Sequence, residues 1–180
     1  MIDSYPKKRN LHRPPHIYLN DTNYFVTTKT FNNIKYFNTN HKKELLFHVF
    51  RKAVDRFNIK LYGWVLLDNH YHLLFWLKRG LDLPKFFQNF HSNSSRLLNA
   101  SDKTYGRKIW HQYQDHGIRD EKDFYTHLNY IHHNPVKHKY AEKMEDYKFS
   151  SYRDYLLEYG QEWVNSCFEQ YSIIDFTQEQ

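Results

Sequence analysis

The sequence predicts an α+β fold, a ferredoxin-like split βαβ sandwich in which helices pack on an antiparallel sheet. Apolar runs of strand length alternate with segments whose apolar residues keep helical spacing, in the order strand–helix–strand–strand–helix–strand. The chain has 180 residues, of which 40% are hydrophobic and 19% aromatic, so it can bury one substantial core. Its 5 Gly and 5 Pro indicate short connections between the elements.

The first half of the pattern starts at residues 24–31, whose β-branched and aromatic side chains predict a strand. Residues 42–58 keep apolar side chains on one helical face and charges on the other. Two apolar runs follow, residues 59–67 and 71–78, separated by Asp68-Asn69, a pair suited to a tight hairpin turn. The run 71–78 is apolar on both faces, which predicts a central strand covered on both sides.

In the second half, a helix is predicted to start near Pro84, and residues 109–118 are a weaker candidate for the last strand. Asp120 is a suitable N-cap for a third long helix, because Asp side chains accept hydrogen bonds from the first backbone N–H groups. That helix is predicted to end near Asn134, because proline at position 135 disfavours helical geometry in the residue before it. A shorter helix is predicted for residues 151–159.

Charge divides the chain into three parts: a basic arm at residues 1–20, one domain at 21–158 and an acidic tail at 159–180. The formal net charge of +6 favours a polyanionic partner, and nucleic acid is the commonest one. The tail either packs as an ordinary terminus or occupies a DNA groove and restrains activity.

The single cysteine, Cys167, excludes an internal disulfide framework, as suits a reducing cytoplasm. No run has the apolar length of a signal peptide or a membrane span. We therefore expect a cytoplasmic protein, associated with the nucleoid and not with a membrane.

His70 and His72 are spaced i, i+2 on the predicted third strand, so their side chains point to the same face. Burying two imidazoles side by side is costly unless their nitrogens find partners, and a divalent metal ion is one such partner. The chain has 13 histidines, so the pair alone is a weak signal, and solvated imidazoles are the plain alternative.

Tyr130 and Asn134 are spaced i, i+4 on the predicted third helix, so one lies above the other. Tyr130 lies beside the apolar stripe of that helix, where a tyrosine is most often a packing residue. If the helix crosses the sheet near the start of the third strand, the Asn134 carbonyl oxygen could join His70 and His72 on one metal ion. Tyr130 would then face the same ion from one turn back.

The chain resembles the REP-associated tyrosine transposases, which belong to the HUH single-strand transposases of short insertion sequences. The resemblance covers roughly residues 15–158 and is carried by four ordered segments, which are NHYHLLFWL, GIRDEKDF, YIHHNPVKH and FSSYRDYL. It places the motif histidines of the family on His70 and His72, the nucleophilic tyrosine on Tyr130 and the amide ligand on Asn134. Tyr71, Asp68 and Phe149 depart from the usual family pattern, but none of these changes removes a catalytic group.

The resemblance implies a metal-dependent single-stranded DNA endonuclease and strand transferase that cuts at hairpins formed by repetitive palindromic elements. Mg²⁺ or Mn²⁺ would be held by His70, His72 and Asn134. Tyr130 would attack the scissile phosphate to give a 5′-phosphotyrosine and a free 3′-hydroxyl, and a second 3′-hydroxyl could reverse this step without ATP.

DNA contacts are expected from basic side chains, each of which could equally be a solvated charge. The candidates are Lys7, Lys8, Arg9 and Arg13 in the arm, Arg96 on the second long helix, and Lys137 and Lys139 near the end of the third. Two other functions stay open: a domesticated, non-catalytic protein that binds hairpins, and a metal-dependent nuclease in which water attacks. Both a monomer and a homodimer are compatible with the motifs.

Overall fold

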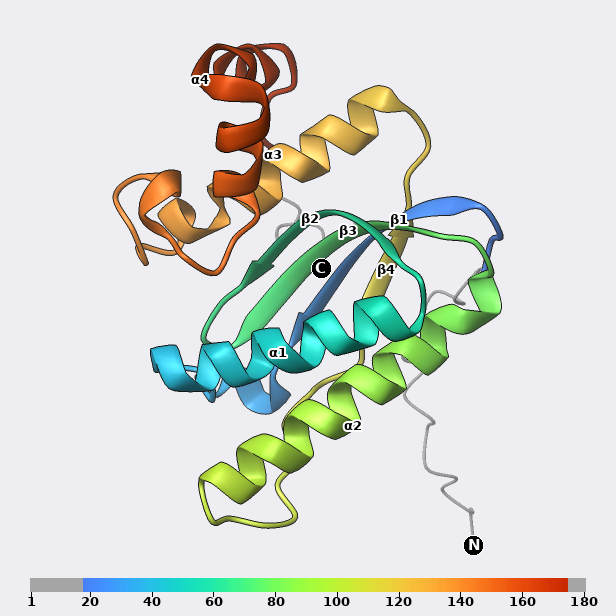
Figure 1. Cartoon of the computed structure of the whole chain (residues 1–180), viewed down its shortest axis with the longest axis vertical. Coiled ribbons are helices and arrows are strands. Elements are labelled where there is room, and N and C mark those ends of the chain that lie inside the picture. The colour runs from blue at the N-terminus through green and yellow to red at the C-terminus, as the bar shows by residue number, and fades with distance from the viewer. Residues whose placement is uncertain (1–17, 175–180) are drawn as a thin grey trace, which may run out of the picture.

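The computed structural model of the chain describes residues 18–174 (Figure 1). The predicted arm cations Lys7, Lys8, Arg9 and Arg13 lie outside this range. Three short 3₁₀ turns accompany the main elements: η1 (Phe31–Asn33), η2 (Gly80–Asp82) and η3 (Met144–Asp146). The strands and long helices are β1 (Thr22–Lys29), α1 (Asn40–Arg56), β2 (Lys60–Leu66), β3 (His70–Leu77), α2 (Leu83–Ser101), β4 (Gln114–Gly117), α3 (Glu121–Lys137) and α4 (Tyr152–Gln170).

The four strands form one antiparallel sheet in the order β2-β3-β1-β4. β1 and β3 are therefore central, as the split βαβ pattern predicts. The hairpin turn between β2 and β3 is tight, because the backbone N–H of Leu67 donates to the His70 carbonyl at 2.8 Å. The predicted fold class and the central place of the third strand are confirmed.

Helices cover both faces of the sheet, with α1 and α2 on one side and α3 on the other (Figure 1). Side chains of β3 alternate between these layers. Phe75 packs toward α2, with its ring 5.8 Å from that of Phe86. His70 and His72 point to the opposite face, where the His72 ring lies 5.1 Å from the ring of Tyr130 on α3.

α3 approaches β2 closely because Gly63 has no side chain where the helix crosses the strand. A Cβ atom at Gly63 would lie 2.8 Å from Leu128 Cδ1 and 3.4 Å from Ile131 Cδ1. Both of these side chains are buried and belong to the core. The pairing of β2 with β3 also shifts register between Leu61 and Gly63.

The end of α3 corrects one prediction. The predicted N-cap is confirmed, since Asp120 Oδ1 accepts a hydrogen bond from the Asp123 backbone N–H at 2.8 Å. However, the helix continues past Asn134 to Lys137, with Pro135 inside it. Asn134 and Pro135 are both buried, so packing against the sheet outweighs the local preference of a residue before proline.

Two other element boundaries differ from the predictions. The last strand is shorter than residues 109–118: β4 has four residues, and upstream of it an isolated bridge joins Thr30 to Trp110. The predicted helix 151–159 instead extends as α4 to Gln170, with a break at Gly160 (φ 81°, ψ 168°). Beyond the break, Cys167 is buried and its carbonyl accepts a hydrogen bond from the Asn129 side chain at 3.0 Å.

Candidate active site

His70 and His72 lie at the start of β3, on the face covered by α3, with only 8% and 2% of their surfaces exposed. Their rings are 5.3 Å apart and nearly perpendicular, at 78°. The strand places both imidazoles on one face because side chains two residues apart point the same way. The structure therefore brings the predicted histidine pair together in a buried position.

A polar group holds the Nδ1 atom of each imidazole. His72 Nδ1 lies 2.7 Å from the hydroxyl oxygen of Thr27, its partner across β1. His70 Nδ1 donates to Asn69 Oδ1 at 2.8 Å, and Asn69 is itself oriented because its Nδ2 donates to the Asn33 carbonyl at 3.2 Å. These contacts fix the ring orientations and direct both Nε2 atoms away from the strand, as supporting groups do around metal-binding histidines.

The two Nε2 atoms lack a hydrogen-bond donor among the described residues. Since His70 Nδ1 carries the proton, its Nε2 is an acceptor in the neutral ring, and it lies 3.2 Å from Asn134 Oδ1, a second acceptor. His72 Nε2 is fully buried and has no hydrogen-bond partner in the described part of the chain. Two facing lone pairs beside a bare imidazole nitrogen are stabilised by a cation, so the set His70, His72 and Asn134 fits a metal ion.

Burial and nearby positive charge keep both imidazoles neutral. Burial, with a smaller contribution from His138, lowers the pKa of His70 to about 3. Burial and the neighbouring His70 hold the pKa of His72 well below its usual value. A metal ion binds the neutral imidazole, so these groups need not lose a proton at neutral pH before they act as ligands.

Tyr130 packs against His72 of this pair. It is 1% exposed, and its ring packs edge-on against those of His72, at 5.1 Å, and Phe25, at 6.1 Å. The Lys137 ammonium lies 5.1 Å from the centre of the Tyr130 ring. The predicted geometry, with Tyr130 one turn before Asn134 and both beside the histidines, agrees with the structure.

Two further basic groups at the site were not predicted. Lys29 pairs with His70 across the sheet, and its charge contributes to the low pKa of both histidines. The His138 ring lies 4.8 Å from that of His70. His138 follows Asn134 by four residues, as Asn134 follows Tyr130. The same helical spacing could therefore have predicted that His138 lies on this face of the helix. The position of Lys29 depends on the strand register.

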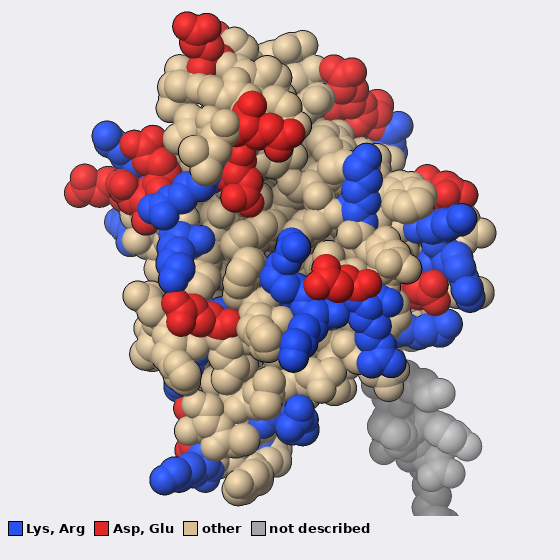
Figure 2. Space-filling model, in the orientation of Figure 1, with Lys and Arg blue, Asp and Glu red and all other residues tan. Residues whose placement is uncertain are grey.

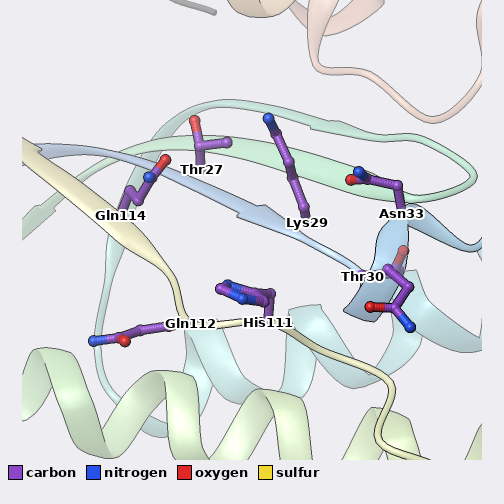
Figure 3. Close-up of a pocket in the computed structure, with 8 residues that line it drawn as sticks. Thr27, Lys29, Thr30, Asn33, His111, Gln112 and Gln114 are labelled. Carbon is purple, nitrogen blue, oxygen red and sulfur yellow. The ribbon is translucent and has the colours of Figure 1, made fainter. Parts of the chain in front are cut away.

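A polar hollow of about 340 Å³ adjoins the site between β1, η1 and the segment that leads into β4 (Figure 3). Thr27 and Lys29 line it from β1, and Asn33 and Gln114 are also among its lining residues. Between the pairs Thr27–Gln114 and Thr30–Trp110 the segment before β4 has one residue more than β1, which is a bulge. The bulge explains why the predicted last strand is interrupted here. Among the described residues, none of those that line the hollow is acidic.

The other predicted DNA contacts are spread over the molecule. Lys137 lies beside Tyr130, as described above, and Lys139 is exposed just after α3. Arg96 is exposed on α2, which covers the opposite face of the sheet. Figure 2 shows acidic side chains gathered at the end of the molecule formed by α4, and Lys and Arg more frequent over the remainder of that face. The DNA-binding role of these residues stays a prediction.

Comparison with known proteins identifies relatives. A family model described as "Transposase IS200 like" matches residues 19–134, a stretch that contains both histidines, Tyr130 and Asn134. The chain is 28% identical over 158 residues to a protein of Haemophilus influenzae assigned to the REP-associated tyrosine transposases, covering 78% of this chain and 86% of that protein. It is 30% identical over 111 residues to the REP-associated tyrosine transposase of Escherichia coli K12, covering 61% of this chain and 64% of the relative.

A solved structure has the same fold. It is a REP-associated tyrosine transposase bound to a REP hairpin, with a TM-score of 0.71 and 22% sequence identity, covering 82% of this chain and 87% of the other. The resemblance inferred from the four sequence segments is thereby confirmed. Within residues 18–174, no helix is both long and apolar enough to span a bilayer.

Proposed function

The chain belongs to the family of IS200-like transposases, enzymes of DNA transposition, and on that basis we propose that it cuts and rejoins single-stranded DNA through a covalent tyrosine–DNA intermediate. Tyr130 is the proposed nucleophile, and His70, His72 and Asn134 are the proposed metal ligands. Single strands that carry a hairpin are the proposed substrate, since a solved relative is bound to a REP hairpin.

One observation carries the proposal. The buried Nε2 of His72, which lacks a hydrogen-bond partner among the described residues, and the facing acceptors of His70 and Asn134 lie next to the ring of Tyr130. Buried polar atoms are normally satisfied, so an unsatisfied set beside a potential nucleophile supports a functional site more than a structural one.

When bound at these ligands, Mg²⁺ or Mn²⁺ supplies Lewis-acid stabilisation to the oxygens of a phosphodiester. Two imidazoles favour Mn²⁺ over Mg²⁺, because Mg²⁺ prefers oxygen ligands and retains waters. The neutral state of both histidines, caused chiefly by burial, is the state that binds a metal. Either ion would be accepted, and we expect Mn²⁺ to bind more tightly.

The side chains of the chain account for the remaining steps. Lys29, in the acid-free hollow, attracts the phosphate backbone. The Lys137 ammonium, 5.1 Å from the centre of the Tyr130 ring, adds a positive charge beside the proposed nucleophile. The Tyr130 hydroxyl gives up its proton to solvent, and its oxygen forms a bond to phosphorus while the P–O3′ bond breaks. The 3′ oxygen takes up a proton from solvent and leaves as a hydroxyl group. The phosphotyrosine conserves the bond energy, so another 3′-hydroxyl can displace Tyr130.

The decisive experiment is trapping of the covalent adduct. Wild-type protein is incubated with a labelled single-stranded hairpin substrate and Mn²⁺, and the products are resolved on denaturing gels. We expect a protein–DNA adduct, which Tyr130→Phe abolishes while DNA binding is retained. Tyr125→Phe removes a hydroxyl from the same helix and is the matched control, which should form the adduct normally.

The two alternative functions give different results in the same assay. Cleavage without an adduct, unaffected by Tyr130→Phe, would identify a hydrolytic nuclease in which water attacks. Tight hairpin binding with neither cleavage nor adduct would identify a binding protein. Either result would overturn the proposed nucleophile.

A further inference from the structure

A second group of potential metal ligands lies where β4 meets α3, in the two helical turns before Tyr130. It consists of His116 on β4 with Asp123 and His127 on α3. One ligand atom from each residue lies within 4.8 Å of the others. Among residues 18–174 these are the only three His, Cys, Asp or Glu side chains that converge in this way. The group shares no residue with the proposed catalytic set.

The geometry places one carboxylate between two imidazoles. Asp123 Oδ2 lies 2.9 Å from His116 Nε2, and Asp123 Oδ1 lies 3.0 Å from His127 Nδ1. The two imidazole rings are stacked, with centres 5.0 Å apart and planes at 24°. Each imidazole thus approaches a different oxygen of the same carboxylate, and His127 Nδ1 also donates to the Asp123 backbone carbonyl at 2.7 Å. A metal ion would therefore bind with release of the protons that these nitrogens carry. The spacing of Asp123 and His127 is i, i+4, which places two ligands on one face of a helix.

The site can be reached from solvent. His116 has 37% of its side chain exposed, and this exposure gives an ion a path from solvent.

We propose that His116, Asp123 and His127 form a second divalent-metal site, which binds Zn²⁺ and fastens β4 to the helix that carries Tyr130. Two imidazoles and one carboxylate are a common ligand set for Zn²⁺, with water as the fourth ligand. Mg²⁺ prefers oxygen ligands, so Zn²⁺ should bind here more tightly than Mg²⁺. An ion at this place would join the two elements whether or not DNA is cleaved, so the proposal does not depend on DNA cleavage.

The position of the site gives the ion a mechanical effect. β4 has four residues and lies at the edge of the sheet, where it pairs only with β1. The ring of Phe25 on β1 contacts both His127, at 4.4 Å, and Tyr130, at 6.1 Å. Fixing β4 to α3 therefore also restrains the part of α3 that holds Tyr130 over the sheet.

Arg119 is the competing partner. Its Nε lies 3.3 Å from Asp123 Oδ2, while 76% of its side chain is exposed, so it can move away at small cost. Removing this guanidinium takes a positive charge away from the site. Metal affinity in Arg119→Ala should therefore equal or exceed that of the parent protein.

The test isolates the second site by removing the first. The full-length His70→Ala/His72→Ala protein is dialysed against Zn²⁺, and bound metal is measured by elemental analysis. We expect one equivalent of Zn²⁺ per chain and a higher melting temperature with Zn²⁺ than with a chelator. Adding His116→Gln should weaken binding at least about tenfold and abolish the stabilisation by Zn²⁺.

Two controls keep the result interpretable. Asp123→Asn should behave as His116→Gln does, while Glu121→Gln, which removes a neighbouring acid outside the group, should leave Zn²⁺ binding unchanged. Circular dichroism without metal verifies that each variant is folded. Absence of Zn²⁺ binding in the double variant, or binding that neither His116→Gln nor Asp123→Asn weakens, would overturn the second site and leave the proposed DNA chemistry untouched.

Discussion

Histidines lie against both faces of β3, buried on the side of α3 and partly buried on the side of α2, and their ring nitrogens have different partners. On the side of α1 and α2, His91 Nε2 lies 2.5 Å from the hydroxyl oxygen of Tyr71, and its ring stacks on Trp110 at 5.1 Å. On the side of α3, His70 Nε2 faces an acceptor, and His72 Nε2 has no hydrogen-bond partner among residues 18–174. On the first face a protein hydroxyl pairs with the histidine nitrogen. On the second face the Nε2 lone pairs of the two histidines are available to a metal ion.

The comparison shows that burial and a shifted pKa do not identify a functional histidine by themselves. Burial lowers the pKa of His91 to about 3, as it does for His70. For the present comparison the relevant difference is that Tyr71 pairs with His91 Nε2, whereas His70 Nε2 faces a second acceptor. Substitutions on the two faces should therefore separate function from stability.

The largest effect is expected from His72→Ala. We expect DNA cleavage to fall at least ~10³-fold, because the metal loses a ligand, while the free energy of unfolding changes by no more than ~1 kcal/mol, because lost packing is offset by removal of a desolvated nitrogen. Initial rates on a hairpin substrate and urea unfolding without metal measure the two quantities. A His72→Ala protein that still cuts would refute this metal site.

Its neighbour on the other face should behave in the opposite way. Leu73 is fully buried, and Leu73→Ala should lower the free energy of unfolding by about 3 kcal/mol, since a buried leucine leaves a cavity. Cleavage per folded molecule, assayed well below the melting temperature, should stay within about twofold of wild type. If Leu73→Ala reduced cleavage as severely as His72→Ala, the proposal that one face of β3 serves function and the other stability would be wrong.

A smaller effect is expected from Thr27→Val, which keeps the shape of the side chain but removes the hydroxyl 2.7 Å from His72 Nδ1. Groups that orient metal ligands typically contribute ~10–100-fold to metal affinity, and we expect a loss in that range. Calorimetric titration with Mn²⁺ measures it. Thr30→Val is the matched control, since its hydroxyl donates to the Ile34 carbonyl and its loss should leave Mn²⁺ affinity unchanged.

The last prediction concerns pH, where each residue contributes modestly per pH unit. Burial lowers the pKa of His70, His91 and His132 to about 3, whereas histidine in an unfolded chain titrates near ~6.5. Below that value the unfolded state binds protons that the folded state does not, so stability falls as pH decreases from about 6.5 toward 3, by at most ~1.4 kcal/mol per pH unit for each histidine. Urea unfolding at pH 7.5, 6.5 and 5.5 measures this. Equal stability at all three values would show that these imidazoles are protonated in the folded protein.

Much of the fold could be predicted because its signals are local. The two-sided apolar character of residues 71–78 indicated a central strand, and Asp120 marked the start of α3 through its capping chemistry. The boundaries that could not be predicted are set by tertiary contacts. The helix passes through Pro135 because Asn134 and Pro135 are buried together, and α4 continues after Gly160 because residues such as Cys167 pack against α3.

The candidate site follows the same division. The spacings of His70 with His72 and of Tyr130 with Asn134 are visible in the sequence. Once the fold class is assumed, they also predict that the two pairs lie close together. Thr27 contacts His72 only through the register of β1 against β3, which the sequence does not specify residue by residue. Side chains that orient the histidines come from other strands, so a motif around the histidines does not identify them.

The close crossing at Gly63 has a consequence for reading mutational screens. A Cβ atom there would lie 2.8 Å from Leu128 Cδ1, so either the Leu128 side chain or α3 would have to shift. If α3 shifts, Tyr130 moves with it, so a residue that touches neither DNA nor metal would change the distance between the phenol and the imidazoles. An inactive but well-folded Gly63→Ala protein would resemble a chemical knockout, although every reactive group would still be present.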